Sequence, residues 1–89
     1  MGKLLVQKFG GSSLANAERI EAVADIIAKT ISEGNRVAVV LSAMGEETDK
    51  LIDLAKQIQP NPNLREYDAL VSTGEQVSVA LMAMALSER

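Results

Sequence analysis

Residues 4–11, with the sequence LLVQKFGG, decide the fold. The apolar and β-branched run from Leu4 to Phe9 stops at the pair Gly10-Gly11, which predicts a buried strand followed by a tight loop. A second aliphatic run, Val37 to Leu41, is too short for a helix and predicts another strand, buried on both faces. Because the intervening segment has helical periodicity, we expect two parallel strands joined by a crossover helix.

Three helices are predicted beside these strands. The first has apolar residues along one face from Ile20 to Ile31, with Asn16 as its N-cap and Gly34 as its C-cap. The second spans about Thr48 to Ile58 and ends before Pro60. The order strand, helix, strand, helix, helix predicts an α/β layered fold that contains part of a parallel sheet.

The third predicted helix, Leu64 to Leu86, is apolar almost all the way round in its second half, Val77 to Leu86. We expect this helix to be buried, and its apolar half is shorter than the roughly 20 residues that cross a bilayer. No membrane role is therefore expected. A stable sheet needs roughly three or more strands, so the chain is expected to be part of a larger domain or to complete itself with a partner.

Composition excludes several classes of function. Hydrophobic residues make up 47% and charged residues 24% of the chain, which is typical of a globular protein. The net charge is −3, there is no basic run, and Phe9 and Tyr67 are the only aromatic residues, so no nucleic-acid partner is expected. The chain has no cysteine or histidine for a zinc site, and no metal ligands are assigned. Because an apolar signal segment is absent from the N-terminus, we expect a cytoplasmic location.

The first candidate site is the end of the first strand, because ligands of parallel sheets collect outside the carboxyl ends of the strands. Gly10 and Gly11 would let the backbone approach a phosphate group closely, and Lys8 would add a positive charge. The same residues also fit an ordinary turn beside a solvated lysine. Neither G-x-x-x-x-G-K-[ST] nor G-x-G-x-x-G is present to decide between these interpretations.

Two further segments contain candidate residues. Ser42 and Thr48 follow the second strand and could hold a small polar substrate, although Thr48 also fits an N-cap and Ser42 a crowded turn. Glu75 places a carboxylate in the mostly apolar third helix. If that carboxylate is buried it needs a partner. The partner could be a ligand ammonium group or a basic side chain from outside these 89 residues.

The chain resembles the aspartate kinase family from end to end. Residues 8–13, KFGGSS, resemble the family's opening motif KFGGTS, with Ser12 in place of the commoner threonine. Residues 40–45, VLSAMG, together with Thr48 resemble the second loop of the family, and residues 72–76, STGEQ, resemble its third signature. The motifs occur in the same order and at fitting intervals.

The resemblance implies an amino-acid kinase fold and transfer of the ATP γ-phosphoryl group to the side-chain carboxylate of L-aspartate, which starts lysine, threonine and methionine synthesis. Lys8 would be the catalytic residue that neutralises the transferring group. Ser42 and Thr48 would contact aspartate, Glu75 would receive its ammonium group, and Mg²⁺ would enter with the nucleotide. The residues that would hold the ATP phosphates are Lys8, Phe9, Gly10, Gly11 and Ser12.

Catalytic domains of this family are much longer, so residues 1–89 are expected to be the N-terminal segment of one, without its nucleotide-base half and without ACT regulatory domains. We expect this segment alone to be inactive and to self-associate through exposed apolar surface, and the parent enzyme to be oligomeric. One alternative is a glutamate, acetylglutamate, carbamate or uridylate kinase, against which Phe9 and residues 72–75 argue. The other is a non-catalytic interaction module whose apolar helix docks on a partner.

Overall fold

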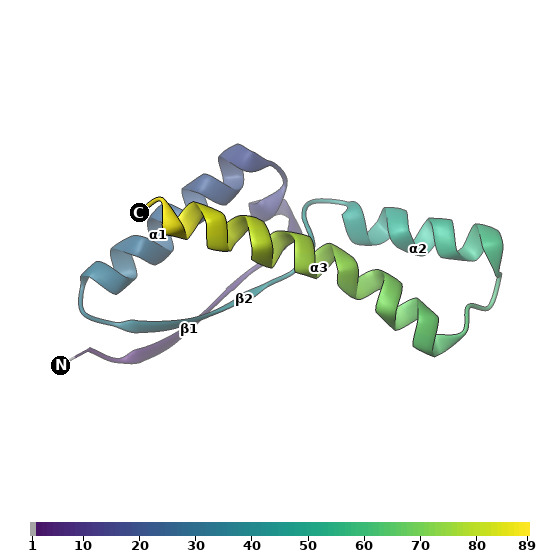
Figure 1. The fold of residues 1–89 in the computed structure, drawn as a ribbon, viewed down its shortest axis with the longest axis horizontal. Coiled ribbons are helices and arrows are strands. Elements are labelled where there is room, and N and C mark those ends of the chain that lie inside the picture. Colours follow the sequence, from purple (N-terminus) through teal and green to yellow (C-terminus); the bar gives the residue numbers. More distant parts are fainter. Residues whose placement is uncertain (1) are drawn as a thin grey trace.

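The computed structural model describes residues 2–89 and has the α/β architecture that the sequence predicts. Two parallel strands form a sheet, and helices cover one of its faces (Figure 1). A short 3-10 helix, which the sequence pattern does not predict, follows the first strand. In chain order the elements are β1 (Leu4–Phe9), η1 (Gly11–Leu14), α1 (Ala17–Ser32), β2 (Arg36–Leu41), α2 (Glu47–Ile58) and α3 (Leu64–Ser87).

The sheet has one covered face and one open face. The strands pair in parallel from Leu4 opposite Arg36 to the last residue of each strand, and exposed side chains alternate with partly buried ones along both. Val6 is 70% exposed and Val40 is 47% exposed. The expectation that the second strand is buried on both faces is therefore wrong for residues 2–89, because the helices pack against the opposite face.

The core lies between the covered face of the sheet and helices α1 and α3. Leu14 of η1 and Ile27 of α1 are almost fully buried, and Met82 brings α3 into the same cluster. Phe9 and Leu41 pack against this cluster from the ends of the two strands. The ends of the strands are therefore fixed by apolar contacts below them, while Gly10 and Gly45 in the loops that follow are exposed.

Helix α1 has the predicted N-cap, Asn16, but its C-cap is Glu33, one residue before the predicted Gly34. The Oδ1 atom of Asn16 accepts a hydrogen bond from the Arg19 N–H at 2.9 Å, which satisfies an otherwise unpaired donor of the first turn. Gly34 follows the helix with a φ of +90°, and its N–H donates to the Ile31 carbonyl at 2.9 Å. Glycine adopts this left-handed conformation without strain and here turns the chain into β2.

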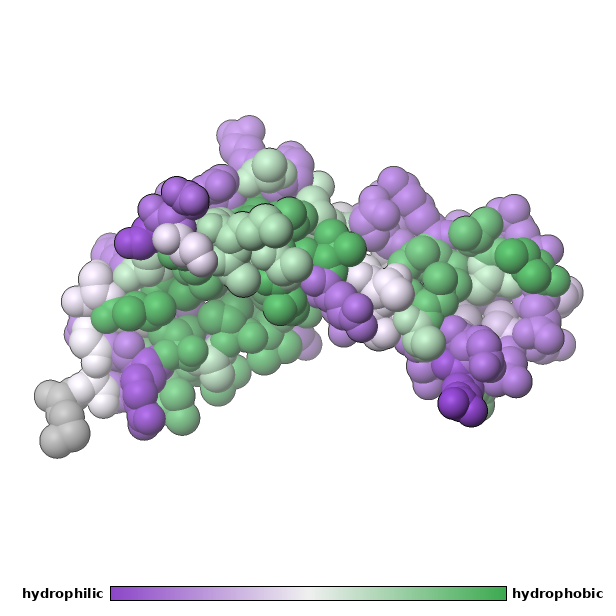
Figure 2. All heavy atoms as spheres, viewed as in Figure 1, coloured by the Kyte–Doolittle hydropathy of each residue, from purple (hydrophilic) through white to green (hydrophobic). Residues whose placement is uncertain are grey.

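Helix α3 is less buried than the sequence predicts. Val79 is 54% exposed and Met84 is 64% exposed, so the expectation of a helix buried all round is wrong for residues 2–89. The helix packs on α1 with its C-terminal half and on α2 with its N-terminal half, and these contacts use one stripe of its surface (Figure 1). Figure 2 shows hydrophobic residues gathered over the strands and the C-terminal half of this helix. The buried residues of the stripe are Gly74, Ser78, Met82 and Ala85.

The same helix is long and apolar enough, by length and composition, to cross a membrane. It has 24 residues and a mean hydropathy of 1.4 over its most apolar window. The expectation that it is too short considered only Val77 to Leu86 and is wrong for the whole helix. Length and composition are weak evidence for a membrane span, because core helices of soluble proteins share both properties.

Helix α2 begins at Glu47, one residue before the predicted start, and has no buried residue. Glu46 occupies the N-cap position and makes no side-chain hydrogen bond there. The alternative in which Thr48 serves as the N-cap is therefore wrong. The turn after α2 is closed by the Asn63 N–H, which donates to Oε1 of Gln59 at 2.9 Å, so α3 folds back along α2.

Arg89 ties the end of α3 to the surface of α1. Its Nε donates to Oδ1 of Asp25 at 2.8 Å, and its Nη2 donates to Oε2 of Glu21 at 2.6 Å. Nη1 donates to the Ala85 carbonyl at 2.6 Å. The hydrogen bonds to Asp25 and then to Glu21 raise the pKa of Arg89. Because the pKa is raised, deprotonation of the guanidinium removes its contribution to stability only in strong alkali.

We expect Arg89→Ala to lower the melting temperature of the 89-residue chain, as measured by circular dichroism. Isolated surface ion pairs contribute little, but one planar guanidinium bonded to two carboxylates and two carbonyl groups has better geometry. Lys50→Ala is the control, because Lys50 makes a single exposed pair with Glu47 at 3.3 Å. Added salt should reduce the difference between the wild-type chain and Arg89→Ala. Equal melting temperatures for the two variants would contradict a stabilising role for Arg89.

Candidate functional site

The loops that follow β1 and β2 are bonded to each other at one edge of the sheet. The Ser42 N–H donates to the Phe9 carbonyl at 3.3 Å, and the Gly45 N–H donates to the Gly11 carbonyl at 2.8 Å. The first bond extends the ladder by one residue beyond β2. Since Lys8 pairs with Val40 on the open face, strand alternation puts Lys8 and Ser42 on the same side of the sheet.

Two glycines make this contact between the loops possible. A Cβ atom at Gly11 would lie 2.8 Å from the Gly45 carbonyl oxygen, which is too close for any side chain. Gly45 has a φ of +48°, a conformation that other residues rarely adopt. The contact therefore leaves no room for a side chain at Gly11, and it uses at Gly45 a left-handed backbone that favours glycine.

Helix α3, which contains Glu75, packs against the second loop. A Cβ atom at Gly74 would lie 2.9 Å from the Ala43 Cβ, so the helix backbone approaches this loop very closely. A pocket of about 490 Å³ beside it is lined by Leu41, Ser72 and Glu75, among others. Glu75 is thus at the carboxyl end of β2, as the two loops are.

The Glu75 carboxylate is exposed rather than buried in residues 2–89. The apolar character of α3 predicts a buried Glu75 carboxylate, which would need a partner. This prediction is wrong for these residues because Glu75 lies outside the buried stripe of the helix. The carboxylate faces solvent beside the pocket and remains free to bind a ligand.

Thr48 lies in the first turn of α2, directly after the second loop. The Glu47 N–H donates to the Met44 carbonyl at 2.9 Å and fixes the start of this helix. The structure brings the three predicted segments to one edge of the sheet. Within residues 2–89, the side chains of Lys8, Ser42, Thr48 and Glu75 form no hydrogen bond or ion pair, with each other or with any other residue.

The loop after β1 has open space beside Gly10. Gly10 is extended, with a φ of −89°, and a Cβ atom placed on it would meet nothing within 4 Å. No side chain caps η1, and the first N–H groups of any helix have no partner within it. Ser12 is exposed, whereas the Phe9 side chain packs in the core and leaves only its backbone for a ligand.

Metal ligands do not gather in the part of the chain that the structure describes. Among residues 2–89, no three His, Cys, Asp or Glu side chains are close enough together to hold a metal ion. Two carboxylates, Glu46 and Glu47, do lie near the second loop, but both are exposed.

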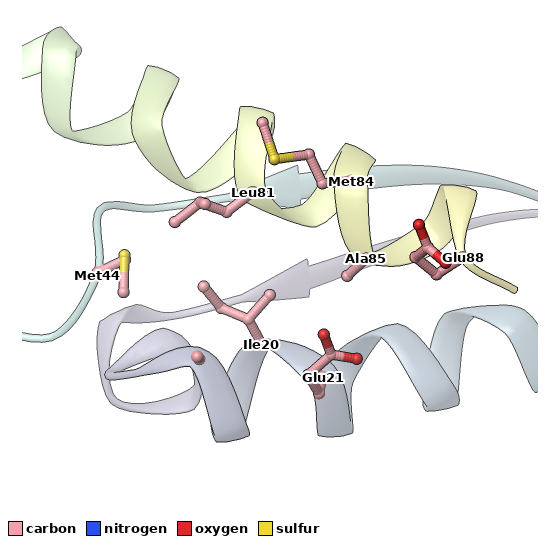
Figure 3. Close-up of a pocket in the computed structure, with 8 residues that line it drawn as sticks. Ile20, Glu21, Met44, Leu81, Met84, Ala85 and Glu88 are labelled. Carbon is pink, nitrogen blue, oxygen red and sulfur yellow. The ribbon is translucent and has the colours of Figure 1, made fainter.

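A separate groove of about 440 Å³ runs between α1 and the C-terminal half of α3 (Figure 3). Met44, Leu81 and Met84 give it an apolar lining. Figure 3 shows the carboxylate of Glu21 directed from α1 towards α3, and Glu88 lies at the other side of the groove. Glu21 is already paired with Arg89, and no lysine or arginine is among the described residues that line the groove, so it offers no positive charge to an anionic ligand such as a nucleotide.

Ala43 and Gly74 are the residues at this edge of the sheet whose contact the sequence patterns do not predict. Ala43 is 3% exposed and lies between the Gly11 loop and α3. Gly74 stands in the interior of a helix, where alanine is favoured by about 1 kcal/mol. A glycine at such a position signals a close approach of backbone, which could have identified it. The neighbour that it approaches becomes known only from the tertiary structure.

Comparisons with known proteins agree with this arrangement. The sequence model that describes the amino acid kinase family matches residues 3–89 of this chain. An aspartokinase of Geobacillus stearothermophilus is 55% identical over 86 residues, which cover 97% of this chain and 21% of the relative. An aspartokinase of Mycobacterium tuberculosis is 57% identical over 83 residues, which cover 93% of this chain and 20% of the relative.

A crystal structure of aspartate kinase from Synechocystis superposes with a TM-score of 0.94 at 60% sequence identity, covering 96% of this chain and 14% of that one. The chain thus spans about a fifth of the length of the curated relatives named above. The match of the family model extends over nearly all of its residues, from the start of β1 to Arg89. The chain belongs to the amino acid kinase family.

Proposed function

We propose that residues 1–89 form the N-terminal segment of the catalytic domain of an aspartate kinase, which phosphorylates the side-chain carboxylate of L-aspartate with ATP. The observation that carries the proposal is the joining of the two loops at one edge of the sheet, with α3 packed against them. The identity of 55% and 57% to aspartokinases over nearly the whole chain supports aspartate as the acceptor. The nucleotide-base half and ACT regulatory domains would lie outside this segment.

The loop after β1 is proposed to hold the phosphates of ATP. The backbone at Gly10 borders open space, and the exposed Ser12 adds a hydroxyl group. Phe9 would contribute its backbone only, since its side chain is in the core. Lys8 provides a positive charge that no carboxylate in residues 2–89 neutralises. Mg²⁺ bound to the nucleotide would offset part of the phosphate charge, without a ligand from this segment.

The second loop and α3 are proposed to hold the aspartate acceptor. Ser42 and Thr48 have hydroxyl groups that can donate to or accept from the amino acid, and Glu75 can receive its ammonium group. All three side chains are free of partners in residues 2–89. Placing them beside the phosphate loop would align the acceptor carboxylate with the γ-phosphoryl group.

This division of the site suits phosphoryl transfer, which needs little covalent participation by the enzyme. Catalysis comes mainly from positioning the two substrates and from stabilising the negative charge that is spread over the transferring group. In our proposal the glycine-joined loops provide the positioning, and Lys8 provides the charge. The role of Lys8 is then electrostatic and does not require that the amine lose its proton.

The proposal extends to the surroundings of the enzyme. We expect a cytoplasmic protein whose substrates are small molecules, with no nucleic-acid or membrane partner. The complete enzyme is expected to be oligomeric. The isolated segment would self-associate through the open face of the sheet and the uncovered side of α3, where Val6 and Met84 are 70% and 64% exposed.

A hydroxylamine assay tests this function, because hydroxylamine converts an acyl phosphate into a stable hydroxamate. We expect no hydroxamate from the 89-residue chain alone. A hybrid in which residues 1–89 precede the remainder of the Synechocystis aspartate kinase should form hydroxamate from ATP and aspartate, and not from ATP and glutamate. An inactive hybrid, or robust activity of the 89-residue chain alone, would contradict the proposal.

A further inference from the structure

We propose that Gly74 is a positioning residue: its contact with Ala43 sets the distance between Glu75 and the loop that carries Ser42. This inference rests on the proposed function, because it concerns how the aspartate side of the site is held. Gly74 itself would touch neither substrate. It would act through the backbone of α3, which moves Glu75 with it.

Ala43 is the residue through which the three segments of the site meet. It is 3% exposed, and its carbonyl oxygen would be 3.3 Å from a Cβ atom placed on Gly11. Its methyl group faces Gly74, where an added Cβ atom would be 2.9 Å away. One small residue is therefore enclosed between the proposed phosphate loop and the helix that carries Glu75.

This contact has no room for another methyl group. Carbon atoms of packed side chains are about 3.5–4.0 Å apart, whereas the two methyl groups would be separated by 2.9 Å. Alanine has no rotamer by which its methyl group could move aside. The loop backbone around Ala43 is held by the bond of the Gly45 N–H to the Gly11 carbonyl at 2.8 Å. The helix is therefore expected to move by roughly 0.6–1.1 Å, the difference between 3.5–4.0 Å and 2.9 Å.

A movement of that size matters for catalysis more than for folding. A misplacement of about 1 Å can lower the rate on the order of 10²-fold, because reacting groups must meet in a narrow range of geometries. Glu75 is the next residue along the helix and would move away from Ser42. Within residues 2–89 the loop after β1 is hydrogen-bonded to the loop after β2 and makes no backbone hydrogen bond to α3, so ATP binding should change little.

The test compares the hybrid kinase with three variants of it. These variants are Gly74→Ala, Ala43→Gly and the double variant. We expect Gly74→Ala to raise the KM for aspartate roughly tenfold or more, with the KM for ATP within about twofold of wild type. The double variant transfers the methyl group from one side of the contact to the other. It should recover most of the lost aspartate affinity, which makes the two substitutions strongly non-additive.

Ala83→Gly is the control for a changed helix propensity, because Ala83 is exposed on the same helix. It should leave both KM values unchanged. A role of Gly74 in stability alone would lower the amount of active enzyme and the apparent kcat, with both KM values preserved, and would overturn the inference. A double variant no better than Gly74→Ala would also overturn it, because the contact with Ala43 would not be the cause.

Melting temperatures of the hybrid kinase and its variants test this inference separately from the proposed function. Alanine is the better helix former, so Gly74→Ala should raise the melting temperature if no contact opposes it. We expect a decrease instead, reversed in the double variant. An increase would overturn the contact even in an active hybrid. A wild-type hybrid that makes no hydroxamate would defeat the proposed function, and the melting temperatures would still decide whether Gly74 and Ala43 oppose an added methyl group.

Discussion

Lys8→Ala is expected to lower the kcat of the hybrid kinase by about 10³-fold, with little change in the KM for ATP. Lys8 is exposed one residue before the end of β1, and no carboxylate in residues 2–89 pairs with it. A lysine without a structural partner can be removed with little effect on the fold. Its loss should therefore appear in the transition state, where negative charge is spread over the transferring phosphoryl group.

Two further variants make this prediction specific to the position of Lys8. Lys3→Ala removes an exposed lysine just before the other end of β1, and should leave kcat unchanged. Lys8→Arg keeps the charge but replaces a compact ammonium with a planar guanidinium, so we expect only partial activity. Steady-state kinetics with ATP and aspartate varied in turn give both constants. Equal losses in Lys3→Ala and Lys8→Ala would indicate general electrostatics and contradict a catalytic Lys8.

Much of the fold could be predicted from the sequence because its signals are local. The strand β1 ends at a glycine pair, and α1 has both a side-chain cap at Asn16 and a glycine at its C-terminal end. Each of these features is decided by a few neighbouring residues. The placement of the site segments at one edge also follows locally, since parallel strands share an edge at their carboxyl ends.

Burial could not be predicted in the same way. Val40 and Met84 are 47% and 64% exposed although their local sequences are those of buried elements. Their hydrophobicity indicates that something should cover them, but residues 2–89 do not provide it. Glu75 is exposed for the same reason, because residues 2–89 do not enclose every side of the apolar helix α3. Burial depends on how much of a domain is present, which no local pattern contains.

Contacts between distant residues are the other feature of the structure that the sequence does not predict. Ala43 and Gly74 are separated by 31 positions (74 − 43) and share no chemical complementarity that would pair them. The bonds of Arg89 to Glu21 and Asp25 join residues that are farther apart still. Small size and exposed charge are common features at the surface of any protein. Only the packing of α3 on α1 and on the second loop makes these residues neighbours.

Glu75→Gln is expected to raise the KM for aspartate by roughly 10- to 100-fold in the hybrid kinase. A hydrogen bond to a charged group contributes about 1.5–3 kcal/mol, which corresponds to that range. Glutamine keeps the size of the side chain and one acceptor oxygen, so the change removes mainly the negative charge. The KM for ATP should stay the same, because the phosphate loop is carried by the sheet.

Two different roles for Glu75 can be separated by measuring stability together with kinetics. If its partner in the complete kinase is the ammonium group of aspartate, the melting temperature without substrate should be unchanged in Glu75→Gln. If its partner is instead a basic side chain from outside residues 1–89, the variant should melt lower and its aspartate KM should be almost normal. Glu66→Gln is the control, because Glu66 is exposed in the first turn of the same helix, away from the strand ends. A normal aspartate KM in Glu75→Gln would remove Glu75 from the aspartate site, whatever happens to stability.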